Sequence, residues 1–317
     1  MIPLVGLLPL FAVFLNATTV VPRSARVGSP RVPAIRQRRP PASDSILLSA
    51  TQLRHRLTRP GVVLLHIGER ADYDAGHIPG ARYLPYAAIS TERPGGPSLE
   101  IAPVAVVATA LESLGVSDDS RIVLYWSKGW YSPTTRVFLT LDYLGLGDRT
   151  SILDGGLDAW KAAGGPLTAA VPRVVRGRLT PHPRSDVMAD AMTVRGSLGD
   201  SRTAIIDARD PRFYAGQSDG MRPRAGHIPG AKNVPFNTLL DDAGRFKSRA
   251  AIEQLLDAAG AVPEKRIICY CHIGQQASMV YFAARLVGRD ARLYDGSWDE
   301  WGRRLDLPVE TGSGVSR

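Results

Sequence analysis

The chain has 317 residues, of which 44% are hydrophobic and 22% are charged, a composition typical of soluble globular protein and sufficient for about two domains. Its net charge of +9 is uneven, because six of the 39 basic residues and no acidic residue lie in residues 1–43, which leaves 33 basic against 30 acidic residues elsewhere. A nucleic-acid-binding protein concentrates basic residues on its folded face, so this distribution excludes nucleic acid as an expected partner.

The N-terminal 43 residues divide into an apolar run over residues 1–15 and a stretch rich in arginine and proline over residues 21–43. The run resembles the hydrophobic region of a secretory signal, although no basic residue precedes it. It is shorter than the roughly 20 residues of a membrane-spanning helix. We expect a signal-like segment, a disordered linker and a periplasmic or otherwise exported protein. A cytoplasmic protein, a short anchor or a misplaced start codon are the alternatives, and no stable membrane contact of the folded domains is expected.

The rest of the chain repeats one pattern of landmarks in the same order. GHIPGA stands at residues 76–81 and 226–231, RIVLY at 121–125 is matched by RIICY at 266–270, and a DG pair precedes both Trp160 and Trp301. A period this long indicates a duplicated domain rather than a solenoid of 20–50-residue repeats. We predict a first domain over residues 44–165, a linker over 166–186, a second domain over 187–308 and a tail over 309–317.

Each copy alternates short apolar runs with amphipathic segments. In chain order we predict a helix over residues 50–57 that Ser49 caps, a strand over 62–65, a strand over 204–206, a strand over 267–270 and a helix over 277–286. This alternation indicates an open parallel α/β sheet in each half. Ligands of such sheets bind beyond the carboxyl ends of the strands.

The two cysteines lie two residues apart, at the end of a predicted strand. Side chains at this spacing are too far apart for an unstrained disulfide, and Cys269 is expected to be buried and inert. Cys271 starts the loop CHIGQQ that leads into a helix. The loop amides and the helix N-terminus are expected to stabilise a thiolate and to lower the pKa of Cys271. Gly274 lets the loop curl around the sulfur.

The ordered motifs resemble the rhodanese family, in particular the two-domain thiosulfate and mercaptopyruvate sulfurtransferases. The resemblance rests on the two GHIPGA segments, Asp207-Ala208-Arg209, the C-x-x-G-x-x-A loop at Cys271 and the DG motif that ends at Trp301. It implies parallel sheets with helices on both faces. It also implies a ping-pong reaction in which an anionic donor passes a sulfane sulfur to Cys271, and the persulfide passes it to cyanide or to a thiol such as a thioredoxin-like protein. No cofactor and no metal are expected.

The resemblance also assigns roles to other positions. Trp126 stands where the second copy has Cys271, so the first domain is expected to be inactive and to shape the cleft. Arg212 matches the substrate-binding arginine of the family, with a surface salt bridge as the alternative. Arg222 or Arg224 could add a second positive charge. The loop residues predicted to contact substrate are His272, Gly274, Gln275 and Gln276.

The histidines and the donor preference leave alternatives open. His77 and His227, within GHIPGA, are expected to satisfy nearby backbone groups. His272 is interpreted as an anion-binding cation, as a neutral hydrogen-bond donor or as a solvent-facing loop residue. The pair His272 and Ile273 matches neither donor class of the family. Ile273 offers no hydroxyl to protonate an enolate, which favours thiosulfate over mercaptopyruvate.

Two other functions are alternatives to sulfur transfer. A cysteine phosphatase with this fold would have an arginine six residues after the cysteine, where this chain has Ala277. A non-catalytic docking module for a sulfur carrier is compatible with the loss of the cysteine from the first copy. The second copy keeps cysteine, glycine and helix start together, which favours an enzyme.

Overall fold

The computed structural model describes residues 46–91 and 99–312. The signal-like segment and the linker predicted for residues 1–43 therefore lie outside the described residues. Within those two ranges, no helix is long and apolar enough to cross a membrane.

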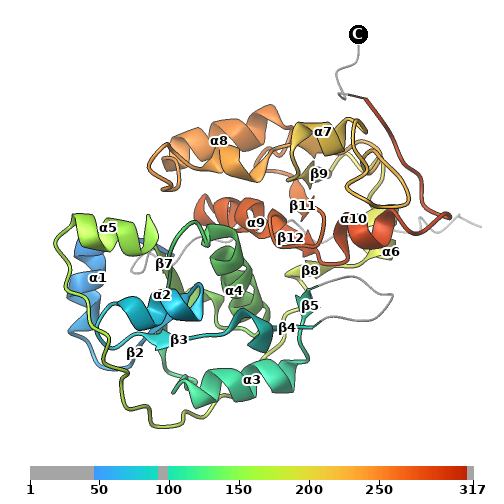
Figure 1. Cartoon of the computed structure of the whole chain (residues 1–317). Helices are drawn as coiled ribbons and strands as arrows, with labels where there is room; N and C mark the ends of the chain where they lie inside the picture. The colour runs from blue at the N-terminus through green and yellow to red at the C-terminus, as the bar shows by residue number, and fades with distance from the viewer. Residues whose placement is uncertain (1–45, 92–98, 313–317) are drawn as a thin grey trace, which may run out of the picture. The chain divides into compact units, whose positions relative to one another are not determined.

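The first domain is built on a parallel sheet in the order β1-β7-β6-β2-β3. Its elements are drawn in blue to green in Figure 1. Its central strands β2 and β6 are buried along almost their whole length, which explains their unbroken apolar sequences VVLLHI and RIVLYW. The strand predicted over residues 62–65 continues to residue 67. The strands are β1 (Leu47–Leu48), β2 (Val62–Ile67), β3 (Arg82–Tyr83), β6 (Arg121–Trp126) and β7 (Thr150–Leu153).

The helices of the first domain follow its strands. Ser49 caps α1, as predicted. The cap is a capping box, in which the Ser49 hydroxyl accepts from the Gln52 amide and the Gln52 side chain accepts from the Ser49 amide. The helices are α1 (Ala50–Leu57), α2 (Arg70–Ala75), α3 (Val104–Ser113), α4 (Tyr131–Tyr143) and α5 (Gly156–Ala162), with 3-10 turns η1 (Tyr86–Ala88) and η2 (Gly147–Arg149). A short antiparallel ribbon joins β4 (Ser90–Thr91) to β5 (Glu100–Ile101).

The second domain repeats this topology in the order β10-β9-β11-β12-β8, again with all pairs parallel. Strand β11 (Arg266–Tyr270) lies between β9 (Thr203–Asp207) and β12 (Ala291–Tyr294), as β6 lies between β2 and β7. The edges are β8 (Met188–Ala189) and β10 (Lys232–Asn233). The helices are α6 (Ala191–Gly196), α7 (Pro211–Tyr214), α8 (Arg249–Ala258), α9 (Ala277–Leu286) and α10 (Ser297–Trp301), with the turn η3 (Phe236–Leu239). The duplication read from the sequence is thus a duplication of fold.

Helices α4 and α9 join the two domains through a shared interface. The rings of Phe138 and Phe282 meet edge to face with centroids 4.8 Å apart, and the Tyr281 hydroxyl donates to the buried carboxylate of Asp142 at 2.6 Å. One continuous cluster of buried apolar residues contains side chains from both domains. The two sheets therefore hold their carboxyl-end loops against a common, well-packed seam.

The GHIPGA histidines do the same structural work in each domain. His77 stacks on Tyr73 with centroids 3.8 Å apart, and its Nδ1 lies 2.8 Å from the Tyr73 carbonyl oxygen. His227 does the same with Tyr214, at 3.9 Å and 2.7 Å. Each histidine also pairs through its backbone with a segment beyond the domain, Thr168 or Glu310. These side chains satisfy nearby backbone groups, as the sequence indicated.

Candidate active site

Cys271 lies directly after β11, at the carboxyl edge of the second sheet. Its side chain is wholly buried, and the backbone N–H groups of Ile273, Gln276 and Ala277 form hydrogen bonds to its sulfur. Because α9 begins at Ala277, the partial positive charge of that helix end also points toward the sulfur. The loop is therefore a ring of amides around one thiol.

The expected low pKa of Cys271 is wrong. Burial raises the pKa of the thiol above its ordinary value, and the three amides offset only part of that effect, while the nearby charge of Asp207 raises it further. The positive charges within electrostatic reach are Arg136 and Arg209. Each of these guanidinium groups is paired with a carboxylate, so neither gives the thiolate an uncompensated cation.

The segment that begins with the DG motif after β12 holds the cysteine loop through hydrogen bonds. The carbonyl oxygen of Cys271 accepts from the Trp298 amide at 3.0 Å, and that of His272 accepts from the Asp299 amide at 2.9 Å. The Cys271 amide donates to the Ser297 hydroxyl at 3.3 Å. Ser297 has a φ of +50°, an uncommon conformation for a residue with a side chain. The motif that served as a landmark thus fixes the position of the loop.

Gly274 is one of the points at which the first domain contacts the loop. Its φ is +79°, and a β-carbon there would lie 2.9 Å from Arg136 Nη1 and 2.9 Å from Asp295 Oδ1. Arg136, on α4, is 1% exposed and forms an ion pair of 2.5 Å with Asp295. Only glycine fits this position, both for its backbone conformation and for the space that the ion pair occupies.

Asp207 and Arg209 form a second buried ion pair behind the loop. Their side chains are 0% and 1% exposed, with 2.6 Å between Arg209 Nη2 and Asp207 Oδ2. Arg209 also donates to the Gly226 carbonyl oxygen at 2.7 Å and lies over the Trp298 ring at 4.6 Å from its centroid. Asp207 therefore stabilises local structure through Arg209.

The three candidate arginines occupy different environments. Arg212 is 70% exposed and pairs with Asp210 at 3.0 Å, which is the surface salt bridge weighed as its alternative role. Arg224 donates to carbonyl oxygens at the end of α10 and in the segment that follows it, which gives it a structural role. Arg222 is 22% exposed, lies 3.5 Å from the carboxylate of Asp299 and lowers the pKa of His272. Of Arg222 and Arg224, Arg222 is the one beside the loop.

His272 is half-buried rather than solvent-facing. Its ring meets the edge of Phe213 with centroids 4.5 Å apart. Burial, helped by the charges of Arg209 and Arg222, lowers its pKa to about 4. His272 is therefore neutral at pH 7, which favours the hydrogen-bond donor among its three interpretations and disfavours the anion-binding cation.

A cavity of about 380 Å³ adjoins the loop at Gln275. The Gln275 side chain donates to the Ser132 hydroxyl of the first domain at 3.4 Å. The buried Gln276 Oε1 has no hydrogen-bond partner among the described residues. Most of the cavity wall belongs to the first domain and comprises Tyr86, Leu99, Lys128, Gly129, Trp130, Ser132 and Pro133.

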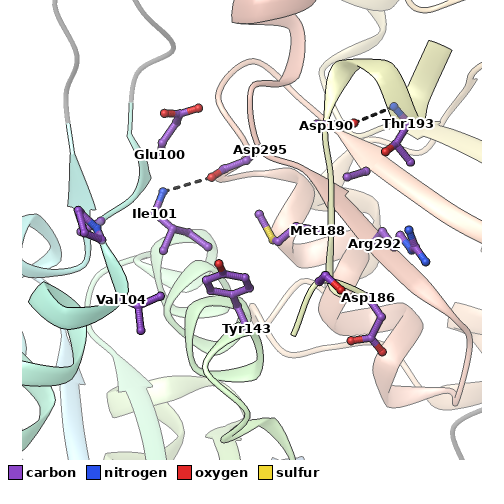
Figure 2. Close-up of a pocket in the computed structure, with 14 residues that line it drawn as sticks. Glu100, Ile101, Val104, Tyr143, Asp186, Met188, Asp190, Thr193, Arg292 and Asp295 are labelled. Carbon is purple, nitrogen blue, oxygen red and sulfur yellow. Dashed lines mark hydrogen bonds between the residues drawn. The ribbon is translucent and has the colours of Figure 1, made fainter. Parts of the chain in front are cut away.

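A second, larger cavity of about 750 Å³ is lined in part by Asp295 (Figure 2). There the Ile101 amide donates to Asp295 Oδ2 at 3.2 Å. Two other acidic groups of this cavity have local partners, since Asp186 pairs with Arg184 and Asp190 caps α6. Within residues 46–91 and 99–312, no group of three or more His, Cys, Asp or Glu side chains is placed to hold a metal ion.

The corresponding loop of the first domain carries Trp126 in place of the cysteine. Strand register places His66 opposite Tyr125 just as it places Asp207 opposite Tyr270. The first domain therefore has a neutral ring where the second has a buried ion pair. His66 Nε2 lies 3.2 Å from the Ser127 hydroxyl, which donates to Asp72 at 3.3 Å.

Sequence reasoning missed the contributions that cross between the domains. Arg136 and Tyr86 approach the Cys271 loop from the first domain, and Asp295 was noted only as part of a landmark. One signal was available, because Arg136 directly precedes the apolar run Val137-Phe138-Leu139 in the sequence. Nothing in the sequence near Tyr86 indicated that this residue lies beside the Cys271 loop.

Comparison with known proteins agrees with this architecture. A family model described as rhodanese-like domain matches residues 49–163 and again residues 191–304. Together these matches cover more than half of the chain. The chain therefore belongs to the rhodanese family, as a tandem-domain sulfurtransferase.

Several curated relatives align along most of the chain. A thiosulfate sulfurtransferase of Azotobacter vinelandii is 31% identical, over 85% of this chain and 98% of the relative. A probable 3-mercaptopyruvate sulfurtransferase of Pseudomonas aeruginosa is 34% identical, over 85% and 99%. The sulfur carrier protein TtuD of Thermus thermophilus is 32% identical, over 86% and 98%.

Among solved structures, an anaerobic ergothioneine biosynthesis enzyme from Chlorobium limicola superposes with a TM-score of 0.75. The alignment is 22% identical and covers 84% of this chain and 70% of that one. At this identity the likeness concerns the fold alone.

Proposed function

We propose that Cys271 is the residue that carries the sulfur and that thiosulfate is the donor. The observation that carries this proposal is the ring of three amides around the Cys271 sulfur at the start of α9. A persulfide adds a second sulfur with negative charge, and amide donors together with a helix N-terminus stabilise such an anion. Cys269 lacks this environment, since its thiol faces the Arg292 carbonyl oxygen within the sheet.

The reaction proceeds in two half-reactions. The Cys271 thiolate attacks the outer sulfur of thiosulfate, a sulfur–sulfur bond forms, and sulfite leaves with the electron pair of the bond that breaks. An acceptor nucleophile, cyanide or a thiolate, then attacks the outer sulfur of the persulfide, and the Cys271 thiolate is released. No external oxidant or reductant is consumed, because the transferred sulfur keeps its oxidation state.

The donor and the acceptor are the finer parts of the proposal. Relatives at similar identity bear the names of both donor classes. Ile273 follows Cys271 by two residues and offers no hydroxyl, which supports thiosulfate. The similarity to a sulfur carrier protein supports a thiol acceptor on a protein. Export of the mature protein remains our proposal for residues 1–43, on the signal-like sequence alone.

The experiment is intact-mass analysis after incubation with thiosulfate, followed by addition of cyanide. We expect the wild type to gain one sulfur and to lose it again as thiocyanate. Cys271→Ser should gain none, whereas the matched Cys269→Ser should behave as the wild type. Sulfur uptake by the Cys271→Ser protein would contradict the assignment.

A comparison of initial rates refines the donor. With cyanide as the acceptor, thiosulfate should turn over faster than 3-mercaptopyruvate. The reverse order would make the protein a mercaptopyruvate enzyme while leaving the role of Cys271 intact. A wild type that takes up no sulfur from either donor would instead favour the non-catalytic docking module.

A further inference from the structure

Tyr86 brings a hydroxyl group of the first domain to the Cys271 site. It lies on the turn η1, which follows the first GHIPGA segment, and it lines the 380 Å³ cavity together with Gln275 of the cysteine loop. Its ring meets Trp130 edge to face with centroids 6.4 Å apart. The ring is thus fixed against the wall of the cavity that adjoins the loop.

The Tyr86 hydroxyl is buried and has no hydrogen-bond partner among the described residues. A buried hydroxyl without a partner is uncommon, because its loss of water is not compensated. Arg136 Nη1, on a side chain that is 1% exposed, is also buried without a hydrogen-bond partner among those residues. Within the part of the chain that the structure describes, the first domain therefore presents two hydrogen-bond donors without partners near the Cys271 loop of the second domain.

Three ionisable groups interact electrostatically with the Tyr86 hydroxyl. They are Arg136 on α4, Asp295 after β12 and Cys271 itself, while Lys128 lies at the rim of the cavity and pairs with Asp72. Burial raises the pKa of Tyr86 to about 12. The phenol thus keeps its proton at neutral pH and is a donor toward any anion held at Cys271.

The duplication supplies an internal comparison for this hydroxyl. Counted from the last glycine of GHIPGA, Tyr86 and Phe236 occupy the same position in the two copies. Phe236 faces the opposite loop, where its ring lies 6.5 Å from that of Tyr131, which in turn lies 6.5 Å from Trp126. The aromatic residue that faces the cysteine carries a hydroxyl, and the one that faces the inactive loop does not.

We propose that the Tyr86 hydroxyl donates a hydrogen bond to the outer sulfur bound on Cys271, so that the first domain, which has no nucleophile, completes the site. The inference rests on the proposed function, because it requires a persulfide at Cys271. In the donor half-reaction the bond strengthens as the outer sulfur gains the negative charge of Cys–S–S⁻ and sulfite departs. In the acceptor half-reaction the acceptor removes the outer sulfur, and the hydrogen bond from Tyr86 to that sulfur is lost. Tyr86 keeps its proton in both half-reactions.

The test compares Tyr86→Phe with the wild type and uses Phe236→Tyr as the matched control. Tyr86→Phe keeps the ring and its packing on Trp130, so we expect a folded protein that still gains one sulfur by intact mass. Loss of a hydrogen bond to a charged group should lower kcat/KM for thiosulfate about tenfold. The apparent pKa of the persulfide, followed by its near-ultraviolet absorbance against pH, should rise by about one unit. Phe236→Tyr should leave both quantities unchanged.

The outcomes separate this inference from the proposed function. An unchanged kcat/KM and an unchanged persulfide titration in Tyr86→Phe, with normal sulfur uptake, would overturn the role of Tyr86 alone. A lower kcat/KM with an unchanged persulfide titration would also overturn it, because a purely structural effect does not shift that pKa. Failure of the wild type to take up sulfur would refute the proposed function, and the role of Tyr86 with it.

Discussion

The two copies of the domain differ in the loops that follow β6 and β11, two strands that occupy equivalent places in the two sheets. The second loop holds Cys271 in a ring of amides with the Asp207–Arg209 ion pair behind it. The first loop holds Trp126, with the neutral His66 at the position of Asp207. Activity in this fold therefore requires the groups around the cysteine as well as the cysteine itself, and the opposite domain supplies some of those groups.

The largest effect is expected from the ion pair that crosses between the domains. Asp295→Asn leaves the buried Arg136 guanidinium without its carboxylate, which should lower the free energy of unfolding by about 4 kcal/mol. The equivalent Asp154 accepts the Phe246 amide at 2.9 Å, a bond that an asparagine oxygen preserves. Asp154→Asn should therefore cost less than about 1 kcal/mol in the same urea titration. Equal losses would show that the interdomain charge pair contributes no special stability.

The glycines of the two loops offer a closely matched pair. Gly274 and Gly129 have φ values of +79° and +78°, but only Gly274 is crowded, since the nearest atom to a β-carbon at Gly129 is 3.9 Å away. Gly274→Ala should cost about 3 kcal/mol and reduce sulfur uptake, from backbone strain plus displacement of Arg136. Gly129→Ala should cost about 1 kcal/mol from strain alone. Urea titration and intact mass distinguish the two, and similar losses would exclude the crowding.

The buried imidazole ring of His66 predicts that the protein loses stability in acid. Burial, helped by repulsion from His77, lowers the pKa of His66 to about 4 from 6.5. The folded-state pKa is depressed, so the unfolded chain takes up the proton first. Stability is then full above pH 6.5 and is lost as the pH falls toward 4, by on the order of 3 kcal/mol for His66. His66→Gln should reduce this slope in urea titrations between pH 4 and 7, and an unaltered slope would contradict the assignment.

The smallest effect is expected when a cysteine is introduced at position 126 of the first domain. Trp126→Cys places a thiol at the end of β6, but the loop has the neutral His66 in place of the Asp207–Arg209 ion pair. The aromatic residue that the opposite domain presents to it is Phe236, which has no hydroxyl. We expect no gain of a second sulfur after thiosulfate treatment, as measured by intact mass in a Cys271→Ser background. Sulfur uptake at position 126 would show that the residue alone explains why the first domain is inactive.

Much of the fold followed from local rules in the sequence. The capped helix after Ser49, the apolar strands and the duplicated order of landmarks all depend on periodicity and spacing, which one chain segment determines by itself. The position of Cys271 at the end of β11 followed for the same reason. The raised pKa of that thiol did not, because it depends on how completely α9, α10 and the first domain cover the loop.

The rest of the site arises from tertiary packing between segments far apart in the chain. Arg136 and Tyr86 precede Cys271 by more than a hundred residues, and only the packing of α4 against α9 brings their domain to the loop. The choice between Arg222 and Arg224 likewise depended on which carbonyl oxygens lay nearby, a fact that spacing does not encode.

The amide-to-carboxylate contacts between the domains are reciprocal. Ile101 of the first domain donates to Asp295 of the second, and Phe246 of the second donates to Asp154 of the first. Such an exchange has the form of an isologous interface, in which two identical subunits present the same patch to each other. Fusion of such a pair into one polypeptide removes the requirement that both halves stay alike. One half can then specialise in holding the reactive atom while the other specialises in what surrounds it.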